Sequence, residues 1–163
     1  MPPTEGSRSD QYPRTLTLAW KRDRLAAQFY NHQTQLMAAK TIIKPAKSPA
    51  AVGPYNHAVR VGDLLFCAGQ IPIDPATGNL VTGEIKAQTE RVLENVKAIL
   101  DDQKLTFASV VKSTVFLTDL ANFAGMNEVY AKYFTENFPA RSTVQVAGLP
   151  KGASVEIEVI AHY

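Results

Sequence analysis

Residues 84–117, EIKAQTERVLENVKAILDDQKLTFASVVKSTVFL, decide the fold because their apolar period changes along the segment. In residues 84–104, apolar side chains such as Val92 and Val96 recur three or four positions apart with charges between them, which predicts a helix with one buried face. Residues 110–117 are rich in β-branched side chains and predict a strand. A helix followed at once by a strand indicates an α-helix packed on a β-sheet.

The chain after this segment repeats the pattern. Residues 123–134 return to helical spacing and predict a second amphipathic helix that ends before Pro139. Two strands are then expected at residues 141–147 and 154–161, joined by the glycine-rich turn of residues 148–152.

The chain before this segment predicts further strands. Residues 40–44 have the composition of a short strand, and residues 59–66 form two strands around the Gly62-Asp63 turn, which is typical of a β-hairpin. The whole order of elements predicts an α+β fold, a mixed sheet with two helices packed on one face.

Composition places the chain among ordinary globular proteins. Its 163 residues, 45% of them hydrophobic and 20% charged, are enough for one domain with a core. No apolar run reaches the roughly 18 residues that would span a bilayer. The only cysteine, Cys67, lies in an apolar strand and is interpreted as a small core residue. The cysteine content favours a reducing, cytoplasmic location.

Charge is distributed unevenly. Residues 1–38 hold five of the 17 lysines and arginines and three of the 15 acids, so residues 39–163 hold twelve of each. A neutral body argues against an extended phosphate-binding surface. The three histidines are scattered without the spacing of metal ligands, so we expect no metal site.

Residues 1–38 are predicted to be an N-terminal extension, flexible or partly helical, that precedes the domain of residues 39–163. Four apolar residues share one helical stripe: Leu18, Leu25, Phe29 and Leu36. One interpretation is a mitochondrial-type presequence, and the other is an extension from an upstream start codon with Met37 as the effective start. Three acids favour the second interpretation, since presequences are poor in acids: Glu5, Asp10 and Asp23.

The last two strands carry the candidate chemistry. If they pair as a hairpin with Thr143 opposite Glu156, alternation gathers five polar residues on one face: Arg141, Thr143, Gln145, Glu156 and Glu158. The other face is then the helix-covered core, with five apolar residues: Val144, Val146, Val155, Ile157 and Val159.

This polar face has two interpretations. Arg141 and the glutamates can form cross-strand ion pairs on a wet surface, each worth about 0–1 kcal/mol. Alternatively, Arg141 can bind a small carboxylate, because a guanidinium offers two parallel donors and keeps its charge.

A resemblance favours the second interpretation. The motifs that carry it are Gly53-Pro54-Tyr55, Ala68-Gly69-Gln70-Ile71-Pro72, Asn127-Glu128-Val129-Tyr130 and Pro139-Ala140-Arg141-Ser142 with Val155-Glu156-Ile157-Glu158. In their order and spacing they resemble the Rid (YjgF-type) family, the reactive intermediate deaminases, and the RidA subgroup most. The resemblance covers residues 39–163.

The resemblance implies an assembly and an activity. It implies a chorismate-mutase-like fold and a homotrimer with a barrel-like centre, whose three clefts lie between neighbouring subunits. The implied reaction is hydrolytic deamination of 2-iminobutanoate and 2-iminopropanoate to 2-oxo acids and ammonia, with no cofactor and no metal. This fits the chemistry, since a protonated imine is already an electrophile and water needs only a position and a base.

The resemblance also assigns roles to residues. Arg141 is expected to bind the substrate carboxylate and Glu156 to place the attacking water. Four more positions are expected to bind substrate: Tyr55 by closing the cleft, Thr143 through its backbone, Gly69 by allowing close approach, and Asn127 as a pocket neighbour.

The sequence departs from the common family motifs at two places, and two alternative functions are considered. Many relatives carry cysteine in place of Thr143, and Asn56-His57 replaces a frequent Ser-Gln, which affects the edge of the cleft. The alternatives are a trimeric binding protein or sensor for small carboxylates without catalysis and, less favoured by the neutral body, a ribonuclease.

Overall fold

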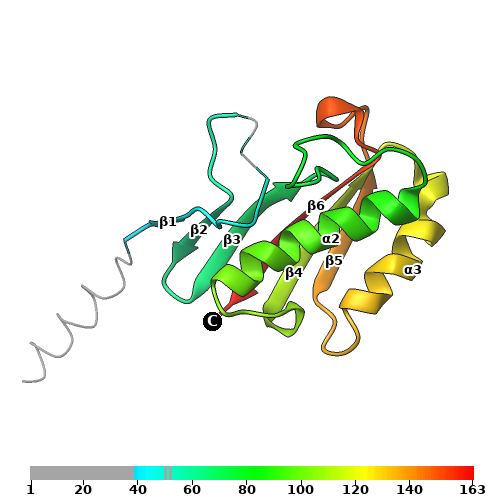
Figure 1. The fold of residues 1–163 in the computed structure, drawn as a ribbon. Coiled ribbons are helices and arrows are strands. Elements are labelled where there is room, and N and C mark those ends of the chain that lie inside the picture. Colours follow the sequence, from blue (N-terminus) through cyan, green and yellow to red (C-terminus); the bar gives the residue numbers. More distant parts are fainter. Residues whose placement is uncertain (1–38, 50, 52) are drawn as a thin grey trace, which may run out of the picture. The chain divides into compact units, whose positions relative to one another are not determined.

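The computed structural model describes residues 39–49, 51 and 53–163. They form one six-stranded sheet with two helices on one face (Figure 1). The predicted α+β class, with one sheet and two helices, is therefore confirmed. The predictions about residues 1–38, a presequence or an upstream extension, lie outside the described residues.

The first three strands form an antiparallel meander. They are β1 (Thr41–Ile43), β2 (Ala58–Val61) and β3 (Leu64–Gln70). The predicted hairpin is confirmed, and Gly62 makes its turn with a φ of 58°, a conformation that glycine adopts without strain.

The remaining elements follow the predicted order. They are α2 (Ile85–Asp102), β4 (Val110–Leu117), α3 (Phe123–Tyr133), β5 (Ala140–Gln145) and β6 (Val155–His162), with 3-10 turns at Phe107–Ser109, Leu120–Asn122 and Pro150–Gly152. Among the described residues, no helix has the length and apolar character needed to cross a membrane.

The pairing of the last two strands differs from the expectation. The sheet order is β1-β2-β3-β6-β4-β5, so β4 lies between β5 and β6. β5 is parallel to β4, because α3 returns the chain to the end of the sheet where β4 began, whereas β6 is antiparallel to both β3 and β4. The predicted hairpin between the last two strands is therefore wrong.

The distribution of side chains changes with the pairing, since residues opposite each other on adjacent strands point to the same face. Arg141 lies beside Ser113 and Thr143 beside Val115, on the face that the helices cover. Glu156 lies beside Phe116, on the open face. Arg141 and Glu156 thus project from opposite faces, contrary to the prediction.

The other members of the expected faces divide in the same way. Gln145 lies beside Leu117 on the helix-covered side, and Glu158 lies beside Thr114 on the open side. Val144, expected in the core, is on the open face and 42% exposed, whereas Val155 and Ile157 are buried as predicted.

The core lies between the sheet and α2, which packs on β6 and β3 (Figure 1). Side chains from both layers are fully buried there, including Leu65, Val115 and Ile157 from the sheet and Val92 and Leu93 from α2. The interpretation of Cys67 as a core residue is confirmed, since its side chain is buried in this cluster.

The open face of the sheet is also apolar. Five large hydrophobic side chains on it are more than a third exposed: Ile42, Val61, Leu64, Phe66 and Val144. Four of them lie on the adjacent strands β1, β2 and β3, and exposed apolar side chains gathered in this way are typical of a protein–protein contact.

Candidate active site

Three of the predicted site residues meet on the open face and form what we call the glutamate half-site: Tyr55, Gly69 and Glu156. They line a cavity of about 220 Å³. Glu156 comes from β6 and Gly69 from the adjacent β3, while Tyr55 comes from the loop before β2. Three apolar or small residues complete the lining: Ala68, Ile71 and Pro150.

Gly69 makes room for the Glu156 side chain. The β3–β6 register shifts between Cys67 and Gln70, and such bulges redirect side chains beside functional sites. A Cβ atom placed on Gly69 would lie 1.8 Å from Oε1 of Glu156. Glu156 therefore lies across β3 only because residue 69 has no side chain.

The environment of Glu156 makes its carboxylate more basic. Burial, and secondarily the negative charge of Glu158, raises the pKa of Glu156 above the ordinary glutamate value. A carboxylate with a raised pKa accepts a proton from water more readily. Glu156 thus has the electrostatic character of a general base.

His57 lies beside Tyr55 of the glutamate half-site. Their rings meet edge to face, with centroids 6.4 Å apart. The backbone N–H of Ala68 donates to the carbonyl of His57 at 2.9 Å, which fixes this loop to β3 beside Gly69. Burial lowers the pKa of His57, so its imidazole is favoured in the neutral form.

The other predicted residues form a second group, the arginine half-site: Arg141 and Thr143 on β5, and Asn127 on α3. The Arg141 guanidinium carbon lies 4.5 Å from the ring centroid of Tyr130 and 5.7 Å from that of Phe123. Asn127 follows Phe123 by one helical turn and precedes Tyr130 by another, so it lies on the same side of α3.

The charge of Arg141 is not neutralised by an acid. Among residues 39–49, 51 and 53–163, no carboxylate forms an ion pair with it; the two ion pairs found there are Lys86–Glu128 and Lys97–Asp101. Apart from a hydrogen bond with the Tyr130 hydroxyl, a half-buried guanidinium held against aromatic rings keeps N–H donors for an anion.

Thr143 offers its backbone to the same place. The N–H of Val146 donates to the carbonyl of Leu117 on β4 at 2.9 Å. Because hydrogen-bonding direction alternates along a strand, the N–H groups of Arg141 and Thr143 point away from β4, at the outer edge of the sheet. The expected role of Thr143 through its backbone is compatible with this orientation.

Sequence reasoning missed the part of Phe123 and Tyr130 in this half-site. Both fall within the amphipathic spacing of residues 123–134, which is typical of core packing; Tyr130 is buried, whereas Phe123 is 40% exposed. An aromatic residue that packs in the core and also contacts a cation fits the apolar period of a helix in the same way as any other core residue. The period therefore cannot distinguish the two. The only available signal was the regular separation of Phe123, Asn127 and Tyr130.

The thiol of Cys67 takes part in neither half-site. Burial raises the pKa of the Cys67 thiol to about 12, so it stays protonated and unreactive at neutral pH. Within the described part of the chain, no three histidine, cysteine or acidic side chains gather as metal ligands.

The two half-sites supply complementary chemistry but do not meet within one chain. The arginine half-site can bind a carboxylate, and the glutamate half-site can hold a base beside a small cavity. They lie on opposite faces of the sheet. Arg141 and Glu156 of one chain therefore face away from each other.

Known proteins resemble this chain over the described domain. The family model described as endoribonuclease L-PSP matches residues 45–163. A RutC family protein of Pyrococcus abyssi is 53% identical over 124 residues, 76% of this chain and 98% of that protein. A goat (Capra hircus) 2-iminobutanoate/2-iminopropanoate deaminase is 47% identical over 122 residues, 75% of this chain and 89% of that protein.

Solved structures agree with these sequence matches. YyfA of Yersinia pestis, described as a conserved Rid family protein of unknown function, is 48% identical with a TM-score of 0.74, covering 77% of this chain and all of that one. TdcF of E. coli, solved with bound serine, is 44% identical with a TM-score of 0.72, covering 76% of this chain and 98% of that one. The match of fold, motifs and family model over three quarters of the sequence means that this chain belongs to the Rid family.

Proposed function

We propose that this protein hydrolyses reactive 2-imino acids, 2-iminobutanoate and 2-iminopropanoate, to 2-oxo acids and ammonia. The observation that carries the proposal is the Glu156 carboxylate, which has a raised pKa and lies across Gly69 in a small cavity. The goat relative named as a deaminase of these two substrates supports the choice of substrate.

The reaction needs only a held substrate and a positioned water. Arg141 binds the substrate carboxylate through two charge-assisted hydrogen bonds, each worth about 1.5–3 kcal/mol. Starting from the protonated imine, Glu156 takes a proton from water as the water oxygen bonds to the imine carbon, and passes that proton to the nitrogen. Glu156 then takes the proton of the new hydroxyl as the carbonyl forms, the carbon–nitrogen bond breaks, and ammonia leaves with the bonding electron pair. Tyr55 covers the substrate at the rim.

The proposed site lies between two copies of the chain, with the arginine half-site of one facing the glutamate half-site of the next. The homotrimer with a barrel-like centre is part of this proposal. Two observations support it: the half-sites occupy opposite faces of the sheet, and the open face exposes Phe66 and Val144. Packing such a face against another copy would remove apolar surface from water.

The direct test follows the imine itself. An amino-acid oxidase generates 2-iminobutanoate in solution, and its disappearance is measured with and without the purified protein. We expect the protein to accelerate the decay in proportion to its concentration. Equal decay in both samples would contradict the proposed activity.

Two substitutions separate catalysis from binding. Glu156→Gln should retain ligand affinity and lose turnover, because the amide cannot accept the proton of water. Arg141→Ala should lose both, because the carboxylate has no other cation in the proposed site. Retained affinity in Arg141→Ala would count against the site assignment.

A non-catalytic binding protein is the second candidate. The observation that favours it is E. coli TdcF, a relative whose structure contains bound serine. Binding alone does not need Glu156. If the wild-type protein and Glu156→Gln bind 2-oxobutanoate equally and neither accelerates imine decay, this second function is the correct one.

A further inference from the structure

Arg141 lies against a ring that is itself anchored in the core. Tyr130 is 5% exposed, and its ring stacks on Phe134 with centroids 4.2 Å apart and planes at 16°. Its hydroxyl lies 2.7 Å from Oγ of Ser113, in a buried hydrogen bond between α3 and β4. Tyr130 is thus fixed at both its ring face and its hydroxyl.

The same strand register fixes the ring and the arginine. Ser113 is the residue of β4 directly beside Arg141 on β5, so the hydroxyl that anchors Tyr130 and the backbone that carries Arg141 are neighbours. The guanidinium carbon stands 4.5 Å from the centroid of the Tyr130 ring. Phe123 offers a second, more distant ring at 5.7 Å.

A ring holds an arginine differently from an acid. A carboxylate would occupy the in-plane N–H groups that recognise another carboxylate, and it would cancel the charge. A ring attracts the guanidinium through its face and leaves those N–H groups available. Burial raises the pKa of the Tyr130 phenol, despite its hydrogen bond with Ser113, the charge of Arg141 and a hydrogen bond with the Arg141 side chain, which favours a neutral ring beside the cation. A guanidinium has five N–H donors, so a contact with one hydroxyl leaves others for a carboxylate.

Fixing the guanidinium in advance matters for binding. A free arginine side chain has many rotamers, and ligand binding must restrict them at a cost in affinity. A side chain that already lies against a rigid ring has lost this freedom before the ligand arrives.

We propose that Tyr130, held by Ser113, is a positioning residue that presents the guanidinium of Arg141 to the carboxylate of the substrate. This inference rests on the proposed function, in which Arg141 binds that carboxylate. It assigns a role to a ring that otherwise has only the packing function of a core residue.

The test measures affinity for 2-oxobutanoate, the product carboxylate, by calorimetric titration of the full-length protein. Tyr130→Phe keeps the ring and should bind within about threefold of the wild type. Tyr130→Leu removes the ring and should weaken binding about tenfold, in the range of a cation–π contact. The KM for 2-iminobutanoate should rise by a similar factor, with a smaller change in kcat.

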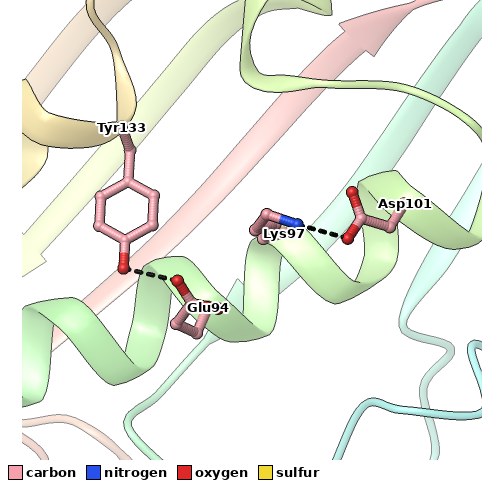
Figure 2. Close-up of polar contacts among 4 residues, drawn as sticks. All are labelled: Glu94, Lys97, Asp101 and Tyr133. Atoms are coloured by element: carbon pink, nitrogen blue, oxygen red, sulfur yellow. Dashed lines mark hydrogen bonds and ion pairs between the residues drawn. The ribbon is translucent and has the colours of Figure 1, made fainter.

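Tyr133→Phe is the matched control. Tyr133 lies on the same helix, and its hydroxyl donates to Oε1 of Glu94 on α2 at 2.7 Å (Figure 2). This hydrogen bond does not involve Arg141. The substitution removes a phenol hydroxyl without touching the arginine half-site, so affinity should stay at the wild-type value.

A second comparison separates positioning from general packing. In an Arg141→Lys background there is no planar guanidinium to hold, so Tyr130→Leu should then weaken binding less than in the wild type. If Tyr130→Leu does not fold, Tyr130→Met, which fills the space with a flexible chain, takes its place in both backgrounds.

The possible results point to different conclusions. Equal loss in the wild-type and Arg141→Lys backgrounds, or no loss from Tyr130→Leu, would overturn the positioning role and leave the proposed function intact. A wild-type protein that does not bind 2-oxobutanoate would contradict the proposed function itself, and the positioning role with it.

Discussion

Residue 69 decides where the Glu156 carboxylate can lie. We predict that Gly69→Ala folds but loses about a hundredfold in kcat, because its Cβ would displace Oε1 and Cδ of Glu156, 1.8 and 2.7 Å away. The displaced atoms are the end of a flexible side chain, so the melting temperature should change little. Gly148→Ala, where a Cβ meets nothing within 4 Å, is the control for imine decay and melting. Full turnover in Gly69→Ala would show that the position of Glu156 is unimportant.

The charge of Glu158 should appear in the pH profile. The proposed base acts when deprotonated, so kcat/KM falls as the pH drops through the pKa of Glu156. Burial raises this pKa most, and Glu158 raises it further. Glu158→Gln should therefore lower the pKa and move the acid limb of the profile to lower pH. Glu90→Gln, an exposed change on α2, should leave the limb in place; an unmoved limb in Glu158→Gln would argue that another group controls the profile.

The roles of single residues were partly visible in the sequence. The motifs identified Tyr55, Gly69 and Glu156, and the structure places these three around one cavity. No role beside Arg141 was predicted for Tyr130, because the helical spacing of residues 123–134 indicates which side chains are buried and does not indicate which charged side chain lies against a buried ring.

At the scale of elements, α2 holds the loops that lead into the glutamate half-site. The buried amide of Asn95 donates to the carbonyls of Ile71 and Ile73, at 3.2 and 2.9 Å. Gln88 accepts from the backbone N–H of Ser154 at 2.9 Å, two residues before Glu156. The helix therefore positions one lining residue, Ile71, and the start of β6.

Loss of the Asn95 amide should destabilise this connection. We predict that Asn95→Leu lowers the free energy of unfolding by about 1–3 kcal/mol, since it removes the amide donor to the Ile73 carbonyl and leaves the Ile71 carbonyl with only the backbone N–H of Ile73. Urea denaturation measures the change. Lys97→Gln on the same helix removes an exposed ion pair with Asp101 (Figure 2) and should cost no more than about 0.5 kcal/mol. Equal losses in the two variants would contradict this account of α2.

The positions of helices and strands were easier to predict than the pairing of the strands in the sheet. The helical spacing of Val92 and Val96 and the β-branched run of β4 gave the correct types and nearly the correct ends. The predicted hairpin of β5 and β6 was wrong because the alternation of apolar and polar residues indicates the two faces of a strand but does not indicate which strands pair with it. The insertion of β4 between them reversed the face of Arg141 relative to that of Glu156.

At the scale of the whole molecule, a single chain holds both halves of the proposed site but cannot join them. The motifs singled out Arg141 and Glu156, but their separation was missed because the error in strand pairing placed both residues on one face. The exposed apolar side chains around Phe66 offer a surface through which copies can associate. The central claim is that catalysis uses Arg141 of one copy and Glu156 of another.

Subunit complementation tests this claim most directly. Arg141→Ala and Glu156→Gln are each unfolded, mixed and refolded together, and imine decay is measured against each variant refolded alone. A mixed oligomer brings an intact Arg141 from one variant to an intact Glu156 from the other, so we predict that the mixture regains activity that neither variant has. A mixture that forms hybrid oligomers and remains as inactive as the separate variants would contradict a site shared between copies.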